Sequence, residues 1–309
     1  MTDTATTQAA ATPTSKQRRK ATSYDANPAK AGWFTRIVLV ILCALWLIPL
    51  LGTLITSFRT TDQAANSGWW SIFTKGFTGL TFSNYHTVLV GNDATNGAAM
   101  GRDFFNSIAI SLPATFIPIL VAAFAAYSFT FMEFKGREFL FLAIVSMLVV
   151  PNYVAFIPVL KVYRSLGLTG FPAVWLAHIG FGMSLAVYIL RNYMATLPRT
   201  VIESAKIDGA SHYQTFFKLV LPMSIPALAS FAIFQFLWVW NDLLVALVFI
   251  GPGENEPVTV GLTHFQGTYN QGWELITAGG FLTMIIPLAV FLGLQRFFVR
   301  GLTAGAVKG

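Results

Sequence analysis

Charged residues and cysteine are both scarce in this chain. Of its 309 residues only 11% are charged and 55% are hydrophobic, and the mean hydropathy is +0.62. Soluble domains carry about 25% charged residues, so a soluble fold of this size could not bury so much apolar surface. The single cysteine, Cys43, excludes an intramolecular disulfide and a cysteine-based metal cluster. The composition therefore indicates a protein for which the lipid bilayer is part of the solvent.

Several signatures of chemistry are missing as well. The phosphate-binding pattern G-x-x-x-x-G-K-[ST] needs the dipeptide Gly-Lys, which occurs nowhere in the sequence. The four histidines are dispersed, and no D-x-D or paired carboxylate lies at the end of an apolar run. The net charge of +7 does not indicate nucleic acid, because the basic residues lie between apolar runs rather than along one face. We therefore expect no catalytic residue, no metal and no cofactor in this chain.

Six apolar stretches are long enough to cross a bilayer as helices, which takes about 20 residues each. They cover residues 34–57, 105–131, 139–160, 172–191, 225–250 and 277–298. Several contain proline, which a transmembrane helix tolerates when neighbouring helices satisfy the freed backbone groups. The sequence thus predicts an all-α integral membrane protein, multi-pass in the cell membrane, with residues 33–300 as its membrane domain.

The distribution of positive charge predicts the orientation. Residues 1–32 are polar and lack periodicity, so we expect a disordered basic tail. If this tail is cytoplasmic, 15 of the 20 Lys and Arg residues fall in inner segments and only 5 in outer ones. This asymmetry predicts that both termini are cytoplasmic, including a C-terminal tail over residues 301–309. The two long outer segments are then residues 59–104 and 251–275.

The inner segment 192–224 carries the most informative pattern. Pro198 suits the first turn of a helix. A short apolar stripe at four-residue spacing is formed by Leu197, Val201 and Ala205. Asp208-Gly209 then breaks the helix, and a second helical run from His212 to Val220 is expected to stop at Leu221-Pro222. From this chemistry alone, the segment is equally compatible with a docking element for another protein and with an amphipathic connector on the membrane surface.

This segment resembles the EAA loop of ABC importer permeases, whose pattern is Glu-Ala-Ala, Asp-Gly-Ala, Phe and Leu-Pro. The matching residues are Glu203, Ala205, Asp208, Gly209, Ala210, Phe216, Leu221 and Pro222. Ser204 replaces the middle alanine, and Tyr213 stands where this subfamily often has tryptophan. Other segments, such as FFNSIAIS (104–111), WVWND (238–242) and QRFFVRGLTAGAVKG (295–309), are similar to the second permease of carbohydrate importers typified by the maltose system.

The resemblance implies a type I ABC importer permease fold and a non-enzymatic role in ATP-driven uptake of a di- or oligosaccharide or a related polyol. The implied partners are a second homologous permease, two ATPase subunits that bind ATP and Mg, an extracytoplasmic sugar-binding protein and membrane lipid. The matching residues and Ser204 would couple this chain to the ATPase. An ion-coupled secondary transporter is the alternative. Such a transporter usually needs several ionisable groups within the membrane, whereas here Asp242 stands alone, and no inverted repeat is evident.

The fifth apolar stretch contains the candidate residues of the substrate path. Phe231, Gln235, Trp238 and Asp242 follow at spacings of four, three and four, so a continuous helix would place them on one face. Gln235, Trp238, Asn241 and Asp242 are therefore candidates for sugar contacts. Alternatively, Asn241 and Asp242 hydrogen-bond a neighbouring helix or the second permease, and we prefer this structural role. His178 and Asn152 are interpreted as helix–helix contacts.

Overall fold

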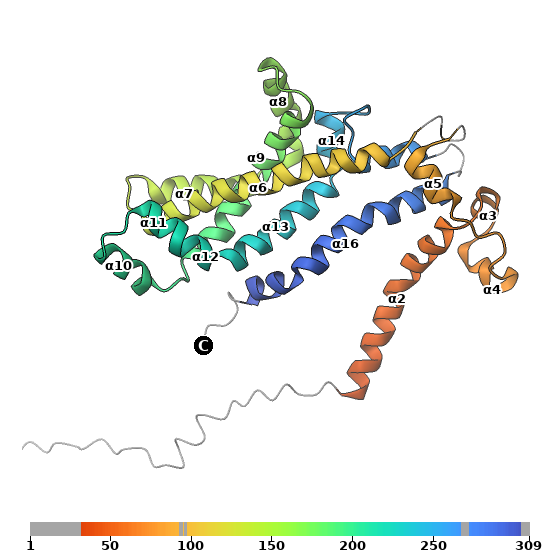
Figure 1. Ribbon diagram of the computed structural model, residues 1–309, viewed down its shortest axis with the longest axis horizontal. Coiled ribbons are helices and arrows are strands. Elements are labelled where there is room, and N and C mark those ends of the chain that lie inside the picture. The colour runs from red at the N-terminus through yellow and green to blue at the C-terminus, as the bar shows by residue number, and fades with distance from the viewer. Residues whose placement is uncertain (1–31, 93–94, 96–97, 267–271, 304–309) are drawn as a thin grey trace, which may run out of the picture. The chain divides into compact units, whose positions relative to one another are not determined.

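The computed structural model describes residues 32–303, apart from 93–94, 96–97 and 267–271 (Figure 1). Every regular element in this described part is a helix, in agreement with the predicted all-α fold class. Residues 1–51 and 52–309 form two units, and each is described by itself. The tails predicted over residues 1–32 and 301–309 lie almost wholly outside the described residues, although residues 301–303 continue the last helix.

Within the described residues, four helices are long and apolar enough to cross a membrane. They are α2 (Trp33–Ser57), α6 (Gly101–Phe131), α9 (Gly170–Met194) and, within α16 (Trp273–Thr303), the segment Trp273–Gln295. These helices lie over the predicted stretches 34–57, 105–131, 172–191 and 277–298. The α2 segment from Trp33 to Leu51 is mostly apolar, and so large an apolar surface needs lipid or partner helices to cover it.

The predicted stretch 139–160 is not one straight helix. It divides into α7 (Arg137–Ser146) with the short η3 (Met147–Val149), and α8 (Asn152–Ser165), and the two parts are bent by 106°. Val150 between them is extended, with φ −74° and ψ 120°. The cause is Pro151, because a residue that precedes proline is disfavoured in the helical region.

The helical run after the EAA-like turn also differs from the prediction. It begins as α11 (His212–Thr215), widens into the π-turn η4 (Phe216–Val220) and continues through α12 (Leu221–Met223). Leu221-Pro222 therefore does not stop it; a 70° bend follows instead, before α13 (Ile225–Trp240). Pro222 has no N–H to donate to the preceding turn, which fits the local widening to i→i+5 pairing.

The two bent helix pairs each satisfy the length and composition of one span when taken together. The described part of the chain is thus compatible with four to six crossings, and the number six stays a prediction. The predicted stretch 225–250 is likewise interrupted: α13 ends at Trp240, and a separate helix, α14 (Leu244–Phe249), follows.

Within residues 52–309, α6 packs along α9 and α13, and α13 packs along α16 (Figure 1). Small residues form much of the contact surface of α6, namely Ala114, Ala122, Ala123 and Ala126, all of them fully buried. Small side chains let helix backbones approach closely, which is how helices associate where lipid removes the hydrophobic driving force.

The predicted outer segments 59–104 and 251–275 contain short helices. The first holds α3 (Thr61–Asn66), η1 (Trp69–Ser71), α4 (Ile72–Lys75) and α5 (Ser83–Val90), and the second holds α15 (Val258–Gly261) and η5 (Leu262–Phe265). The start of α6 holds the second segment in place, since Asn106 Nδ2 donates to the carbonyl oxygens of Glu254 and Glu256 at 3.0 and 2.9 Å.

Candidate functional site

The EAA-like loop forms a compact helix–turn–helix whose first helix is α10 (Arg199–Ile207). Ile202 is its inward-facing anchor, at 3% exposure. The predicted apolar stripe of Leu197, Val201 and Ala205 is wrong in part: Leu197 is buried, Ala205 is half-buried and Val201 is exposed. Leu197 precedes the helix, since Pro198 is the N-cap, so its position does not follow the helical spacing.

Two backbone hydrogen bonds close the turn that follows α10. Gly209 has φ +79°, a conformation that glycine adopts without strain. The Gly209 N–H donates to Lys206 O at 3.1 Å and the Ala210 N–H to Ala205 O at 2.9 Å, which is the Schellman pattern of a helix C-terminus.

A capping box begins the next helix directly. The Ser211 side chain accepts from the Gln214 N–H at 3.3 Å, and the Ser211 N–H donates to Gln214 Oε1 at 2.9 Å. Because the two motifs follow one another without a free residue between them, the angle between α10 and α11 is closely determined. Ser211 and Gln214 were not predicted from the sequence, although the S-x-x-Q spacing is the signal of such a capping box.

The tip of this loop presents apolar side chains outward. Ile207 is 86% exposed and Tyr213 is 70% exposed. Ser204 is exposed too, and its hydroxyl donates to Thr200 O at 2.9 Å, so it behaves as a small residue with no unsatisfied donor. Glu203 is exposed in the second turn of α10, and no acidic residue lies in the first turn. The dipole of α10 therefore gives Glu203 no first-turn stabilisation.

Phe216 attaches the loop to the helix bundle. It is 3% exposed, and its ring stacks on that of Phe124 in α6 with centroids 4.6 Å apart. Beside it, Tyr127 Oη lies 2.9 Å from His212 Nδ1. The EAA-like residues thus divide into an exposed group (Glu203, Ser204, Asp208 and Gly209) and an inner anchor, with Leu221 half-buried and Pro222 exposed.

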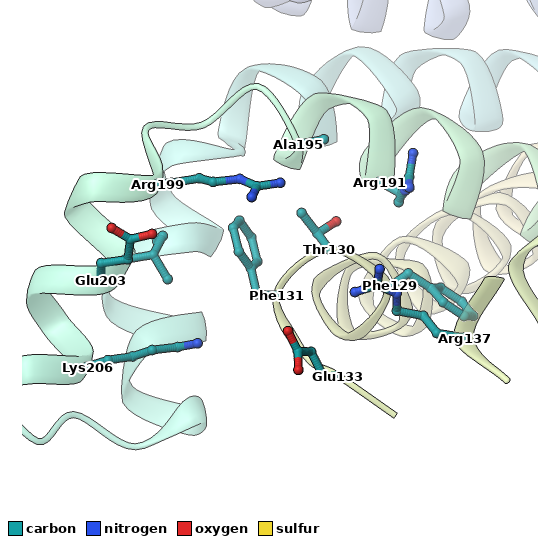
Figure 2. A pocket seen from close by; sticks show the side chains of 11 residues that line it. Phe129, Thr130, Phe131, Glu133, Arg137, Arg191, Ala195, Arg199, Glu203 and Lys206 are labelled. Carbon is teal, nitrogen blue, oxygen red and sulfur yellow. The ribbon is translucent and has the colours of Figure 1, made fainter. Parts of the chain in front are cut away.

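A hollow of about 360 Å³ lies between α10 and the bundle (Figure 2). Its lining residues come from the C-terminal ends of α6 and α9, from the start of α7, and from α10 itself: Phe129, Thr130, Phe131, Glu133, Arg137, Arg191, Ala195, Arg199, Ile202, Glu203 and Lys206. Four of them are basic and two are acidic. Figure 2 shows Arg199 and Lys206 extending from α10 toward the end of α6.

The predicted face of Phe231, Gln235, Trp238 and Asp242 is interrupted, because Asp242 lies beyond the end of α13. The Asn241 side chain donates to Leu237 O at 2.8 Å, at the C-terminus of that helix. The Asp242 carboxylate accepts from the N–H groups of Val245 and Ala246, at 2.7 and 3.3 Å. The carboxylate thus caps α14 and competes with continuation of α13.

Gln235 is a helix–helix contact. It is 1% exposed, and its Nε2 donates to Ala114 O in α6 at 3.1 Å and to His178 O in α9 at 3.4 Å. Trp238 is 38% exposed, with its ring 6.3 Å from that of His178. His178 Nε2 lies 4.0 Å from Asp242 Oδ2. The structure therefore brings Trp238, His178 and Asp242 together and assigns Gln235 to packing.

Residues 105–304 match the family described as the binding-protein-dependent transport system inner membrane component. This match covers more than half of the chain, so the chain belongs to that family of ABC importer permeases. It is a multi-pass membrane subunit and not itself an ATP-hydrolysing enzyme, and the alternative of an ion-coupled transporter is not supported. Among the described residues, no three His, Cys, Asp or Glu side chains gather as a metal site.

Curated relatives extend the likeness over most of the chain. It is 49% identical over 276 residues, 88% of this chain and 91% of the relative, to the osmoprotective compounds uptake permease protein GgtD of Synechocystis sp.. It is 50% identical over 237 residues, 74% of this chain and 61% of the relative, to the alpha-glucoside transport system permease protein AglG of Rhizobium meliloti. The trehalose transport system permease protein SugB of Mycobacterium tuberculosis is 34% identical over 74% of this chain and 83% of its own.

Solved structures agree on the fold. A bacterial ABC transporter that imports the acidic polysaccharide alginate matches with a TM-score of 0.69 at 18% identity, covering 94% of this chain and 100% of that one. The same kind of transporter in complex with an alginate pentasaccharide-bound periplasmic protein matches with a TM-score of 0.61 at 13% identity, over 86% of this chain and 94% of that one. These likenesses confirm the importer permease fold, and the expected resemblance to carbohydrate importer permeases is confirmed by the curated relatives.

Proposed function

We propose that this chain and a second, homologous permease form the membrane path for a sugar or related polyol. A binding protein outside the cell delivers the substrate, and two separate ATPase subunits that bind ATP and Mg supply the energy. Support comes from relatives whose names specify alpha-glucosides, trehalose and osmoprotective compounds. Uptake that survives a protonophore but stops when ATP is depleted is the expected result, and loss of uptake with the proton gradient alone would contradict the proposal.

The observation that carries this proposal is the exposed apolar tip of the capped loop between α10 and α11. Ile207, at 86% exposure, gains stability only if a partner covers it. We assign ATPase coupling to the residues of the EAA-like pattern: Glu203, Ser204, Ala205, Asp208, Gly209, Ala210, Phe216, Leu221 and Pro222. Their inner anchor on α6 gives a mechanical route, since a movement of the tip reaches α6 through the stacked ring of Phe216.

The coupling test is a pair of substitutions in α10. Ile207→Ser should weaken retention of the ATPase subunits during purification and lower ATP-driven uptake, because it removes apolar area from the tip. Thr200→Ser is the matched control, since it keeps a hydroxyl on an exposed residue of the same helix. Normal uptake and normal retention of the ATPase by the Ile207→Ser protein would show that the loop is only a connector.

For the substrate path, the geometry supports Trp238 and Asp242 over Gln235 and Asn241. Both amides are already engaged with backbone carbonyls, at 3.1 Å for Gln235 and 2.8 Å for Asn241. Trp238 offers an exposed aromatic face. Asp242 lies near it, since the side chains of Trp238 and Asp242 are both close to that of His178. We infer that Trp238 contacts the substrate, while Asp242 holds the break between α13 and α14 open beside it.

A further inference from the structure

The hollow behind α10 carries more positive charge than the coupling role of the loop requires. Its lining contains Arg137, Arg191, Arg199 and Lys206 against Glu133 and Glu203, a net of +2 when all six are charged. Within the described residues, only Arg137 of these four has an ion pair, with Glu138 at 2.9 Å. Arg191, Arg199 and Lys206 therefore face the hollow with their charges uncompensated by a salt bridge.

Arg191 is held in place by its ring contact. Its guanidinium carbon lies 4.7 Å from the centre of the Phe141 ring, a cation–π arrangement. Its Nε is buried and has no hydrogen-bond partner. Because this Nε is inaccessible, an anion in the hollow would meet the terminal nitrogens of the Arg191 guanidinium and not its Nε.

The hollow also continues onto an apolar surface. A second hollow of about 370 Å³ shares Glu133 and Arg137 with it and is lined further by Phe134, Gly136, Glu138 and Phe139; Glu138 is the ion-pair partner of Arg137. Phe139 is 78% exposed, and farther along α7 Leu142 is 65% exposed. Basic side chains thus lie next to an exposed apolar helix face, in the order in which a phospholipid presents its headgroup and its acyl chains.

We propose that this hollow binds the phosphoryl headgroup of an anionic phospholipid, with an acyl chain along α7. Three features favour a lipid over an acidic segment of a partner protein. The basic groups come from the ends of α9 and α10 and the start of α7, and the apolar surface adjoins one of them, Arg137, on α7. Basic hollows between helices at the cytoplasmic side of a membrane also suit anionic headgroups. Because one wall is α10 itself, a bound headgroup would bridge the coupling helix to the bundle.

The experiment titrates the purified, assembled importer with phosphatidylglycerol or phosphatidylcholine and counts bound lipids by native mass spectrometry. The wild-type complex should bind phosphatidylglycerol more tightly. Arg191→Gln with Arg199→Gln should weaken that binding by roughly tenfold or more, on the basis of about 1 kcal/mol per basic residue near an anionic surface. Lys218→Gln is the matched control, because it removes a charge from an exposed residue of the same loop outside the hollow.

A further variant and a second ligand keep the test decisive. Lys206→Gln changes an exposed side chain of α10, so it should weaken binding without disturbing packing if the double variant assembles poorly. Equal binding of phosphatidylglycerol by Lys206→Gln, the double variant and Lys218→Gln would overturn the proposal. So would displacement of the lipid by inorganic phosphate at equal concentration, which would identify a free-phosphate site. Loss of the ATPase subunits with lipid binding unchanged would also overturn it, in favour of a protein contact.

Lipid binding in the hollow can be tested separately from the proposed coupling role, because native mass spectrometry measures the bound lipid itself and not transport. If Ile207→Ser leaves transport unchanged, the coupling proposal fails while the lipid titration still stands. If instead lipid binding is unaffected by the charge variants, the coupling proposal is untouched.

Discussion

Gln235 shows how one buried amide holds three helices in register. Its side chain comes from α13 and donates to carbonyl oxygens in α6 and α9. The contact needs a gap in α9, which Gly182 supplies: a Cβ atom there would lie 2.7 Å from Gln235 Oε1. The polar contact and the small residue are therefore parts of one arrangement.

Gly182→Ala should destabilise the complex by about 1–3 kcal/mol, because the new methyl group displaces a buried amide from its partners. Thermal unfolding of the purified importer measures the effect. Gly180→Ala, two residues earlier in α9, is the control, since a Cβ there meets nothing within 4 Å. Equal melting temperatures for the two variants would show that the helices separate easily enough to admit the methyl group.

Trp238→Ala should lower substrate uptake by roughly tenfold or less while the complex still assembles, in proportion to an aromatic contact of about 0.5–1.5 kcal/mol. Uptake and subunit composition are measured on the same preparation. Leu244→Ala in α14 serves as the control, because Leu244 is also a partly exposed apolar residue, at 46%. If Trp238→Ala instead loses the second permease, its ring belongs to the interface between permeases and not to the substrate path.

Among the helices, the joint between α10 and α11 depends on its caps. Ser211→Ala removes the side-chain acceptor for the Gln214 N–H, which should cost about 1 kcal/mol locally and loosen the angle between the two helices. The expected result is ATP hydrolysis that is less dependent on substrate. Ser211→Asp keeps an acceptor at the N-cap and should retain coupling, and identical behaviour of the two variants would assign the angle to other contacts.

Long apolar helices could be predicted from the sequence, whereas their breaks could not. Length and hydropathy alone located α2, α6, α9 and α16, since a span has few other solutions in lipid. The break at Val150-Pro151 was missed because proline is tolerated inside such helices. The end of α13 was missed because it depends on the Asp242 carboxylate meeting the N–H of Val245, which is a local competition that hydropathy does not report.

The candidate site was predictable to a similar degree. Its pattern of residue types was recognisable, and the turn at Gly209 is where the sequence placed it. The side chain that α10 buries could not be predicted, because Pro198 shifts the start of the helix and Ile202 takes the buried position. The basic hollow was invisible to sequence reasoning, because it combines side chains from α7, α9 and α10 that lie far apart along the chain.

For the molecule as a whole, the charge asymmetry predicts which end of the bundle faces the cytoplasm. On a Cys43→Ser background, Glu254→Cys should react with a membrane-impermeant thiol reagent in intact cells. Lys206→Cys should react only after the cells are opened. Both side chains are exposed, so a lack of labelling cannot be explained by burial within this chain. Labelling of position 206 in intact cells would show that the topology is the reverse of the predicted one.

The π-turn η4 also fits an additional residue into the helix that carries the loop. A turn with i→i+5 pairing contains one residue more than an α-helical turn, so the wider turn takes up that residue within a single revolution. Deleting one residue within Phe216–Val220 should therefore return the run to ordinary winding and leave the direction of the exposed tip at Ile207 nearly unchanged. Deleting one residue from α13, which has no wide turn, should instead rotate everything before it by about 100°. The π-turn is thus the place below this loop where the chain tolerates a change in length.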